Sequence, residues 1–158
     1  MPLIAEANEY IAAPIDRVWR TLLRLDEYAL WNPFTPEVRN ARVGEPARVD
    51  DVFTFVVHWQ DGSTFVSPER VLIIEPPRRD DNGVLRARFV YRFAHWMHGA
   101  RLMRATRSTW LEQRDGEPTH YRTSEQMRGV LARFAPIDKV RVGFAAQARA
   151  LKQCCEAP

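Results

Sequence analysis

The sequence predicts an α+β fold in which an antiparallel sheet packs against one long C-terminal helix. Residues 84–93 alternate apolar or aromatic side chains with mostly charged ones, which is the period of a strand with one buried face. Turn sequences such as Asp61-Gly62 and Asp115-Gly116 separate strand-like segments, so neighbouring strands are expected to pair as hairpins. Residues 136–156 repeat apolar side chains every three or four positions, as an amphipathic helix does. No parallel crossover is needed, which favours the α+β class.

Length and composition indicate one globular domain over residues 1–158. Hydrophobic residues make up 46% of the chain and charged residues 27%, which is ordinary for a globular protein. No stretch approaches the roughly 20 apolar residues of a membrane span. Because the N-terminus also lacks the profile of a signal peptide, we expect a cytoplasmic protein. Although the net charge is +3, the basic side chains are spread over solvent positions, which disfavours a nucleic-acid partner. The sequence leaves a homodimer open.

The N-terminal third predicts one strand and two short helices. The first strand covers residues 6–11, and Ala13-Pro14-Ile15-Asp16 is typical of a helix start. A second short helix is expected over residues 26–30. It ends at Trp31-Asn32-Pro33-Phe34-Thr35-Pro36, where two prolines prevent helix continuation.

The next hairpin has a specific predicted register. A two-residue turn at Asp61-Gly62 joins residues 52–59 to residues 64–74 and places Trp59 opposite Thr64. The same register pairs two further positions, Val57 with Val66 and Phe55 with Pro68. One face then carries Phe53, Phe55, Val57, Trp59, Val66, Leu72 and Ile74. The other face carries Thr54, His58, Ser67 and Glu69. Glu75-Pro76-Pro77 is expected to end the second strand.

Several motifs occur in the order found in the helix-grip superfamily, and the chain resembles that superfamily over its whole length. The motifs are Ile11-x-Ala13-Pro14-Ile15-x-x-Val18-Trp19, Leu25-Asp26-x-Tyr28-x-x-Trp31-Asn32-Pro33, Glu75-Pro76-Pro77-Arg78, Glu125-x-Met127-x-Gly129, and Gly143-Phe144 with Ala150-Leu151-Lys152. The superfamily, also called SRPBCC, includes START domains, birch-pollen-type allergens and a polyketide cyclase/dehydrase and lipid-transport group. The bacterial branch of that last group is the most similar.

The resemblance implies a helix-grip fold, with a curved sheet wrapped around the C-terminal helix and a cavity between them. It also implies ligands that are hydrophobic or aromatic. It does not imply catalysis, because the same fold hosts carriers, receptors, co-chaperones, quinone-binding proteins and cyclases.

The last hairpin has two open registers. A three-residue loop, Asp115-Gly116-Glu117, pairs Arg107 with Glu125, Thr109 with Thr123 and Leu111 with Tyr121, all facing inward. A two-residue loop shifts the pairing by one, so that Thr106 meets Glu125 and Trp110 meets Tyr121. We favour the first register because the resemblance puts Tyr121, Thr123, Glu125 and Met127 on the cavity side.

The candidate ligand-binding residues are those expected to face the cavity or its mouth. They are Trp31, Asn32, Phe53, Phe55, Trp59, Phe89, Tyr91, Phe93, Arg107, Thr109, Tyr121, Thr123, Glu125, Met127 and Phe144. Two interpretations stay open for Trp31 and Asn32, which either plug one end of the core or contact the ligand at the mouth. The aromatic side chains either line the cavity or fill it.

An inward Glu125 needs a partner, because an unpaired buried carboxylate is costly. Arg107 is the expected partner. The pair either orients the cavity wall or recognises an acidic ligand through Arg107, and a third interpretation is proton transfer by Glu125.

No cofactor or metal is predicted. The chain shows no phosphate-binding glycine loop, nucleotide fingerprint or Ser-His-Asp order. His95 and His98 are three residues apart, but they lie in an expected strand connection with no cysteine or acidic ligand close to them. All four histidines, His58, His95, His98 and His120, are therefore interpreted as solvated surface residues. The adjacent Cys154 and Cys155 exclude a disulfide framework and are expected at the frayed end of the last helix.

Three functions follow from these patterns. The leading hypothesis is binding of a small hydrophobic molecule, which is aromatic, polyketide-like or lipid-like. The second is a polyketide cyclase/aromatase, with Glu125, Tyr91 and Tyr121 as weak catalytic candidates that move protons. The third is a co-chaperone-like interaction module that uses Arg86, Arg88 and Arg92 on the outer sheet face.

Overall fold

The computed structural model describes residues 1–158 and contains one seven-stranded antiparallel sheet. The strand order is β1-β7-β6-β5-β4-β3-β2. The strands are β1 (Leu3–Ile11), β2 (Glu37–Arg39), β3 (Val52–His58), β4 (Thr64–Arg79), β5 (Leu85–Phe93), β6 (Arg104–Gln113) and β7 (Thr119–Arg128). The helices are α1 (Ile15–Leu23), α2 (Trp96–Gly99) and α3 (Ile137–Glu156), with two 3-10 turns, η1 (Leu25–Leu30) and η2 (Ala132–Phe134). The predicted α+β class is confirmed.

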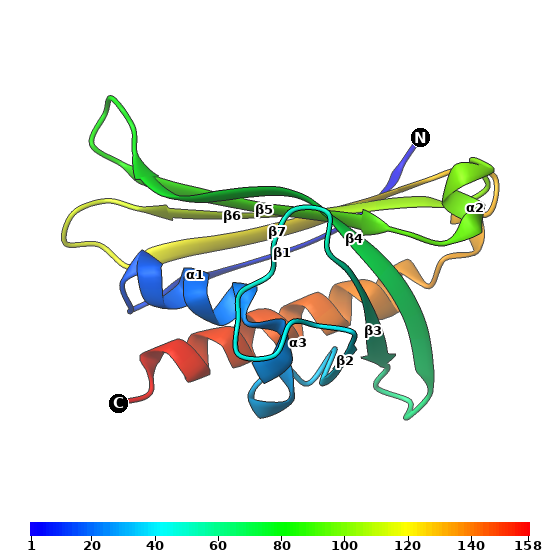
Figure 1. Ribbon diagram of the computed structural model, residues 1–158, viewed down its shortest axis with the longest axis horizontal. Helices are drawn as coiled ribbons and strands as arrows, with labels where there is room; N and C mark the ends of the chain where they lie inside the picture. The colour runs from blue at the N-terminus through cyan, green and yellow to red at the C-terminus, as the bar shows by residue number, and fades with distance from the viewer.

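The sheet curls around α3, which runs along its concave side (Figure 1). β4 bends down beside the N-terminal half of the helix and carries β3 with it. Two register shifts interrupt the pairing of β4 with β5, between Val71 and Ile73 and between Glu75 and Arg78. Because such bulges bend a strand and increase its twist, they account for the curvature that makes a concave wall. No helix is long and apolar enough to cross a membrane.

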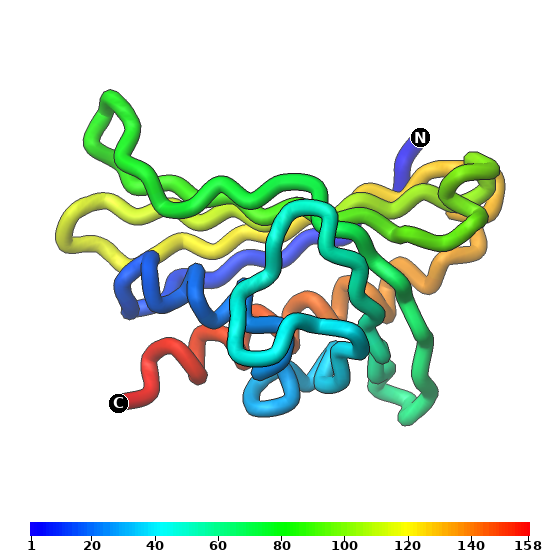
Figure 2. The backbone as a smooth tube through the Cα atoms, viewed as in Figure 1, coloured from blue at the N-terminus to red at the C-terminus, as the bar shows by residue number.

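α1 packs one end of the core, as its apolar spacing predicts. Its buried side chains are Ile15, Val18, Trp19, Leu22 and Leu23. The start of the helix is held by Gln113, whose Oε1 accepts from the Ile15 N–H at 3.0 Å. The expected second short helix forms as the 3-10 turn η1. Figure 2 shows the C-terminal end of α3 close to the start of α1, where the Ala12 N–H donates to Glu156 Oε1 at 2.7 Å.

The stripe predicted for the last helix is confirmed, since Val140, Phe144, Ala148 and Leu151 are all buried. The helix remains regular through Glu156, so Cys155 is buried and its Sγ donates to Thr21 Oγ1 at 3.6 Å. The expectation that both cysteines lie at a frayed end is therefore wrong for Cys155.

The alternation of β5 and the favoured register of the last hairpin are confirmed. On β5, Ala87, Phe89, Tyr91 and Phe93 are buried, while Arg86 is exposed. The β6–β7 pairs include Arg107 with Glu125, Thr109 with Thr123 and Leu111 with Tyr121.

The predicted register of the β3–β4 hairpin is wrong by one residue. The structure pairs His58 with Thr64 and Phe55 with Ser67. The cause is a longer connection over residues 59–63, in which Asp61 Oδ1 accepts from the Ser63 N–H at 2.9 Å. Because a shift of one residue turns a side chain to the opposite face, Ser67 and Glu69 lie inside the molecule.

The same correction moves Val66 and Leu72 outward, where both are exposed. β4 also runs past Glu75-Pro76-Pro77 to Arg79, so the prediction that this segment ends the strand is wrong. Both prolines lie within the second register shift of β4, where a missing N–H does not interrupt the ladder.

Candidate ligand-binding cavity

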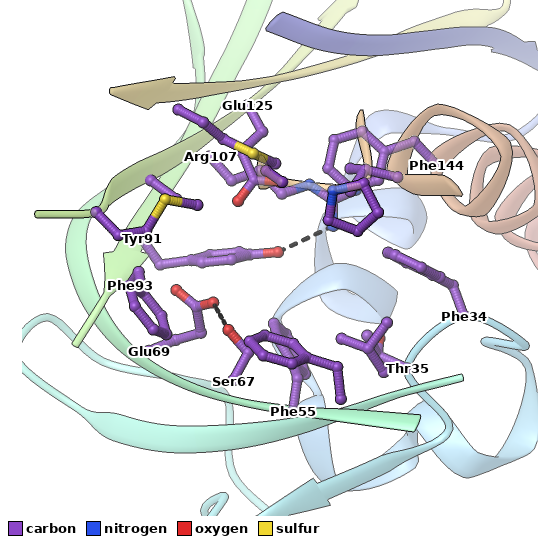
Figure 3. Close-up of a pocket in the computed structure, with 18 of the residues that line it drawn as sticks. Phe34, Thr35, Phe55, Ser67, Glu69, Tyr91, Phe93, Arg107, Glu125 and Phe144 are labelled. Carbon is purple, nitrogen blue, oxygen red and sulfur yellow. Dashed lines mark hydrogen bonds between the residues drawn. The ribbon is translucent and has the colours of Figure 1, made fainter. Parts of the chain in front are cut away.

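A cavity of about 340 Å³ lies between the concave face of the sheet and the N-terminal half of α3 (Figure 3). Of its 22 lining residues, 16 are hydrophobic. Volumes of roughly 300–1,000 Å³ with mostly apolar walls are typical of sites for small organic molecules. The aromatic side chains therefore line a space rather than fill it.

Eight of the fifteen candidate residues line this cavity. They are Phe55, Trp59, Tyr91, Phe93, Arg107, Glu125, Met127 and Phe144. The other seven lie outside its wall. They are Trp31, Asn32, Phe53, Phe89, Thr109, Tyr121 and Thr123.

Asn32 and Trp31 pack the core and do not reach the cavity. The Asn32 Oδ1 accepts from the Phe34 and Thr35 N–H groups at 3.0 and 3.1 Å, and its amide nitrogen donates to Thr35 Oγ1 at 2.9 Å. The Asn32 side chain is thus used within its own turn. Trp31 packs edge-on against Tyr28 at 4.9 Å between ring centroids. The residues that follow, Phe34 and Thr35, line the cavity in their place.

The remaining five residues form a layer behind the wall. The Phe53 ring packs against Phe55 at 4.8 Å, and the Phe89 ring packs against Tyr91 at 5.3 Å between centroids. The hydroxyl groups of Thr123 and Tyr121 accept hydrogen bonds from Arg107, and the Thr109 hydroxyl contacts Thr123. Thr123 Oγ1 accepts from Arg107 Nε at 2.9 Å and lies 3.1 Å from Thr109 Oγ1. These residues shape and support the wall.

Arg107 is a buried cation with only neutral hydrogen-bond partners. Its side chain is 4% exposed. The guanidinium donates to Thr123 Oγ1, to Tyr91 Oη at 3.1 Å, to Tyr121 Oη at 3.4 Å and to Gln147 Oε1 at 3.0 Å. Of its five N–H groups, one on Nη1 has no acceptor in the protein. Figure 3 shows the hydrogen bond between the Tyr91 hydroxyl and the Arg107 guanidinium.

The predicted ion pair between Arg107 and Glu125 does not form. The two residues are directly opposite each other on β6 and β7, yet no carboxylate lies within 4.0 Å of the guanidinium. The reason is that the Arg107 side chain extends toward α3, where it lies over the Phe144 ring and reaches Gln147.

Two carboxyl groups share the cavity with this cation. Burial raises the pKa of Glu69 well above its ordinary value, and the neighbouring Glu125 raises it further. Burial also raises the pKa of Glu125, against the opposing effect of Arg107. Glu69 accepts from the Ser67 hydroxyl at 2.8 Å (Figure 3). Raised pKa values favour protonated carboxyls, which donate hydrogen bonds as well as accept them.

Fourteen of the lining residues were not among the candidates, and two groups of them have an identifiable cause. Phe65, Ser67 and Glu69 were missed because the β3–β4 register was placed one residue away. The second group comes from two loop segments, and its members are Met97, Met103, Leu131 and Phe134. Their signal was present, since large apolar side chains in connections have no strand or helix face to explain them.

The cavity opens between η2, the start of α3 and the β3–β4 hairpin. This follows because Phe65, Leu131 and Phe134 are both wall residues and solvent-exposed. Lys139 Nζ of α3 forms an ion pair with Asp61 Oδ2 of this hairpin at 2.6 Å.

The histidines do not gather at the cavity, and residues 1–158 hold no group of three or more side chains arranged to bind a metal ion. His58 is exposed, as expected. His95, His98 and His120 are half-buried, so their interpretation as solvated residues needs correction. The His120 ring stacks on Tyr10 at 4.5 Å between centroids.

Comparison with solved structures identifies the fold. A hypothetical protein from Helicobacter pylori superposes with a TM-score of 0.71 at 12% identity, covering 96% of this chain and 87% of that one. The Zhui aromatase/cyclase from Streptomyces sp. R1128 gives a TM-score of 0.69 at 18% identity, covering 99% and 94%. A START superfamily protein from Mycobacterium smegmatis gives 0.66 at 15% identity, covering 97% of each chain.

This chain has the helix-grip fold. The fold expected from the sequence resemblance is thereby confirmed. No family model matches the sequence, and no curated protein matches it. In this chain, the cavity lies under the N-terminal half of α3.

Proposed function

We propose that this helix-grip protein binds one small hydrophobic molecule that carries an acidic or phenolic oxygen. The apolar body lies against the aromatic wall, and the oxygen lies at Arg107 and Tyr91. The observation that carries this proposal is the buried guanidinium of Arg107, which has no carboxylate partner and keeps one N–H free beside an apolar cavity. A ligand oxygen that accepts from the free N–H stabilises this buried charge, whereas a purely apolar ligand leaves the N–H without an acceptor.

The wall favours flat or unsaturated ligands. Phe34 and Phe144 meet edge to face at 5.8 Å between centroids, and Phe55 and Tyr91 do the same at 5.6 Å. Rings in these orientations present both edges and faces to a guest, and aromatic guests pack well against both. A hydroxyl on the guest also finds partners in Glu69 and Glu125. Aromatic and polyketide-like molecules therefore fit better than a plain saturated chain.

A cyclase or aromatase activity is the second candidate. Three groups able to move protons, Glu69, Glu125 and Tyr91, line the cavity around the proposed oxygen site. One of the similar solved structures is named an aromatase/cyclase. Such a reaction would use the cavity to hold a reactive chain in one conformation and exclude water.

The interaction-module alternative has less support. Of the three arginines that it invokes, Arg86 is already paired with Asp80 and Glu112, at 2.7 Å each. Arg92 donates to the carbonyl of Phe93 at 3.2 Å. The cytoplasmic location and a homodimer stay predictions.

Two dyes and two variants test ligand binding. Anilinonaphthalene sulfonate carries an anionic group, whereas Nile red is uncharged, and both fluoresce in apolar cavities. Ala105→Phe fills the cavity from β6, while Thr106→Phe places the same ring on the outer face of that strand. We expect saturable dye binding that Ala105→Phe abolishes and Thr106→Phe leaves unchanged. Absence of binding to the wild type, or equal binding by both variants, would contradict the proposal.

A test of the cyclase or aromatase activity requires a known substrate class. Native mass spectrometry of freshly purified protein would identify a molecule retained in the cavity. A reaction on that class of molecule is expected to slow in Glu125→Gln and Tyr91→Phe. Full turnover in both variants would remove these residues from any mechanism.

A further inference from the structure

Beside the cavity opening lies a rim, formed by α2, the 100–104 loop and residues 128–136, which carries large apolar side chains that no part of the chain covers. Trp96 of α2 is 67% exposed, and Phe134 of η2 is 69% exposed. Val130 and Leu131, which precede η2, are also exposed. The two segments lie side by side, since the Leu131 N–H donates to the Leu102 carbonyl at 3.0 Å and α2 sits next to the β7–η2 connection in Figure 1. Neighbouring segments that both expose large apolar side chains are typical of an interaction site.

The same rim carries only positive charge. Neither segment 94–106 nor segment 126–137 contains Asp or Glu. Their exposed arginines are Arg101, Arg104, Arg128 and Arg133, and none of them forms an ion pair. On the opposite rim, the carboxylate of Asp61 is already paired with Lys139. The Arg133 guanidinium lies over the exposed Phe134 ring at 4.8 Å from its centroid. Four arginines without an acidic partner, on segments that also expose apolar side chains, are complementary to a surface that is apolar beneath a layer of anionic groups.

We infer that this rim, made of α2, the 100–104 loop and residues 128–136, docks onto an anionic lipid bilayer. Trp and Phe side chains insert at the interface between headgroups and acyl chains, and Arg side chains bind the phosphates. A protein or nucleic-acid partner is less favoured. A bilayer has apolar acyl chains beneath a layer of phosphates, and the exposed aromatic side chains and unpaired arginines of the rim match these two layers. Since Leu131 and Phe134 belong to both the rim and the cavity wall, docking places the opening against the membrane.

The inference extends the proposed function by naming where the hydrophobic ligand enters. The two are separable, because membrane binding is measured without ligand. A failure to bind vesicles leaves the dye-binding test intact, and a failure to bind dye leaves docking intact.

Sedimentation with vesicles tests the inference on the full chain. The wild type is expected to pellet with vesicles of phosphatidylcholine and phosphatidylglycerol, and to stay in the supernatant with phosphatidylcholine alone. Trp96→Ala/Phe134→Ala is expected to lose at least about tenfold in partition coefficient. Arg101→Gln/Arg133→Gln is expected to lose a similar factor and to weaken the dependence on salt.

Matched controls lie at other exposed positions. Leu30→Ala/Val43→Ala removes exposed apolar side chains away from the rim, and Arg20→Gln/Arg149→Gln removes the same charge away from it. Both controls are expected to bind vesicles as the wild type does. No binding to either vesicle would overturn the inference, and so would an equal loss in the rim variants and the controls. Retention on immobilised polyglutamate through Arg101 and Arg133, without vesicle binding, would assign the rim to an acidic protein instead.

Discussion

The guanidinium carbon of Arg107 lies 3.9 Å from the centre of the Phe144 ring. Arg107 belongs to the sheet and Phe144 to α3, so this contact joins the wall of the cavity to its roof. The hydrogen bond from Arg107 to Gln147 Oε1, one helical turn further along α3, strengthens the same junction. The cation that we assign to ligand recognition therefore also positions the helix.

Replacing Phe144 by Leu is expected to lower the free energy of unfolding by about 1–3 kcal/mol. The loss combines the ring volume with the cation–π interaction. Urea unfolding followed by circular dichroism measures it. Phe134→Leu changes the same side chain at an exposed position and is expected to stay within about 0.5 kcal/mol of the wild type. Equal stability of the two variants would contradict a structural role for the Arg107–Phe144 contact.

Replacing Arg107 by Met is expected to keep the fold and to alter ligand selectivity. A linear apolar side chain of similar length fills the space of Arg107 and removes the cost of burying a cation. It also removes the hydrogen bonds to Tyr91 and Gln147, so we expect a lower free energy of unfolding but a cooperative transition. Affinity for anilinonaphthalene sulfonate is expected to fall about tenfold or more, whereas affinity for Nile red stays the same. Arg149→Met, on the exposed side of α3, serves as the control. If both dyes lost affinity equally, the role of Arg107 in recognising an anionic oxygen would be refuted.

Replacing Glu69 by Gln is expected to stabilise the protein above pH 7 and to have little effect near pH 5. Burial and Glu125 raise the Glu69 pKa above its ordinary value of 4.5, so between these pH values the folded state binds more protons than the unfolded state. Stability then falls as the pH rises toward the folded-state pKa. Melting temperatures across this range measure the effect, and exposed Glu6→Gln is the control. A wild-type melting temperature that rose with pH, with no benefit from Gln, would contradict the raised pKa.

Replacing Gly143 by Ala is expected to lower stability by about 1–3 kcal/mol, although Ala favours helix. A Cβ at this position would overlap the Phe34 ring, which packs directly on the helix backbone. Thermal unfolding measures the loss. The double variant Gly143→Ala/Phe34→Leu is expected to recover part of it, because Leu leaves room for the methyl group. Additive losses in the double variant would show that the two residues do not interact.

Much of the fold was predictable because its signals are local. The alternation of β5 and the stripe of α3 depend on periodicity within single segments, and both are confirmed. The β6–β7 register followed from the resemblance as well as from the loop. These elements supply Tyr91, Arg107 and Glu125, the polar centre of the cavity.

The rest of the site depends on turn geometry and on contacts between distant segments, which the hydrophobic pattern of one segment does not record. A turn that closes over five residues instead of two moved Ser67 and Glu69 from the outer face into the cavity. The choice of Gln147 over Glu125 as a partner of Arg107 depends on where α3 docks, which is a property of the whole fold. Seven residues predicted to contact the ligand do not line the cavity, because the period of a segment shows which face a side chain is on and not how far it lies from the cavity surface.

The ion pair between Lys139 and Asp61 joins α3 to the β3–β4 hairpin. Both side chains are half exposed, and such pairs contribute at most about 1 kcal/mol. Thermal motion at physiological temperature breaks an attachment of that strength often. Under the proposed ligand-binding function, a guest that passes between α3 and the β3–β4 hairpin has to separate this ion pair, so residence times are expected to shorten as ionic strength increases.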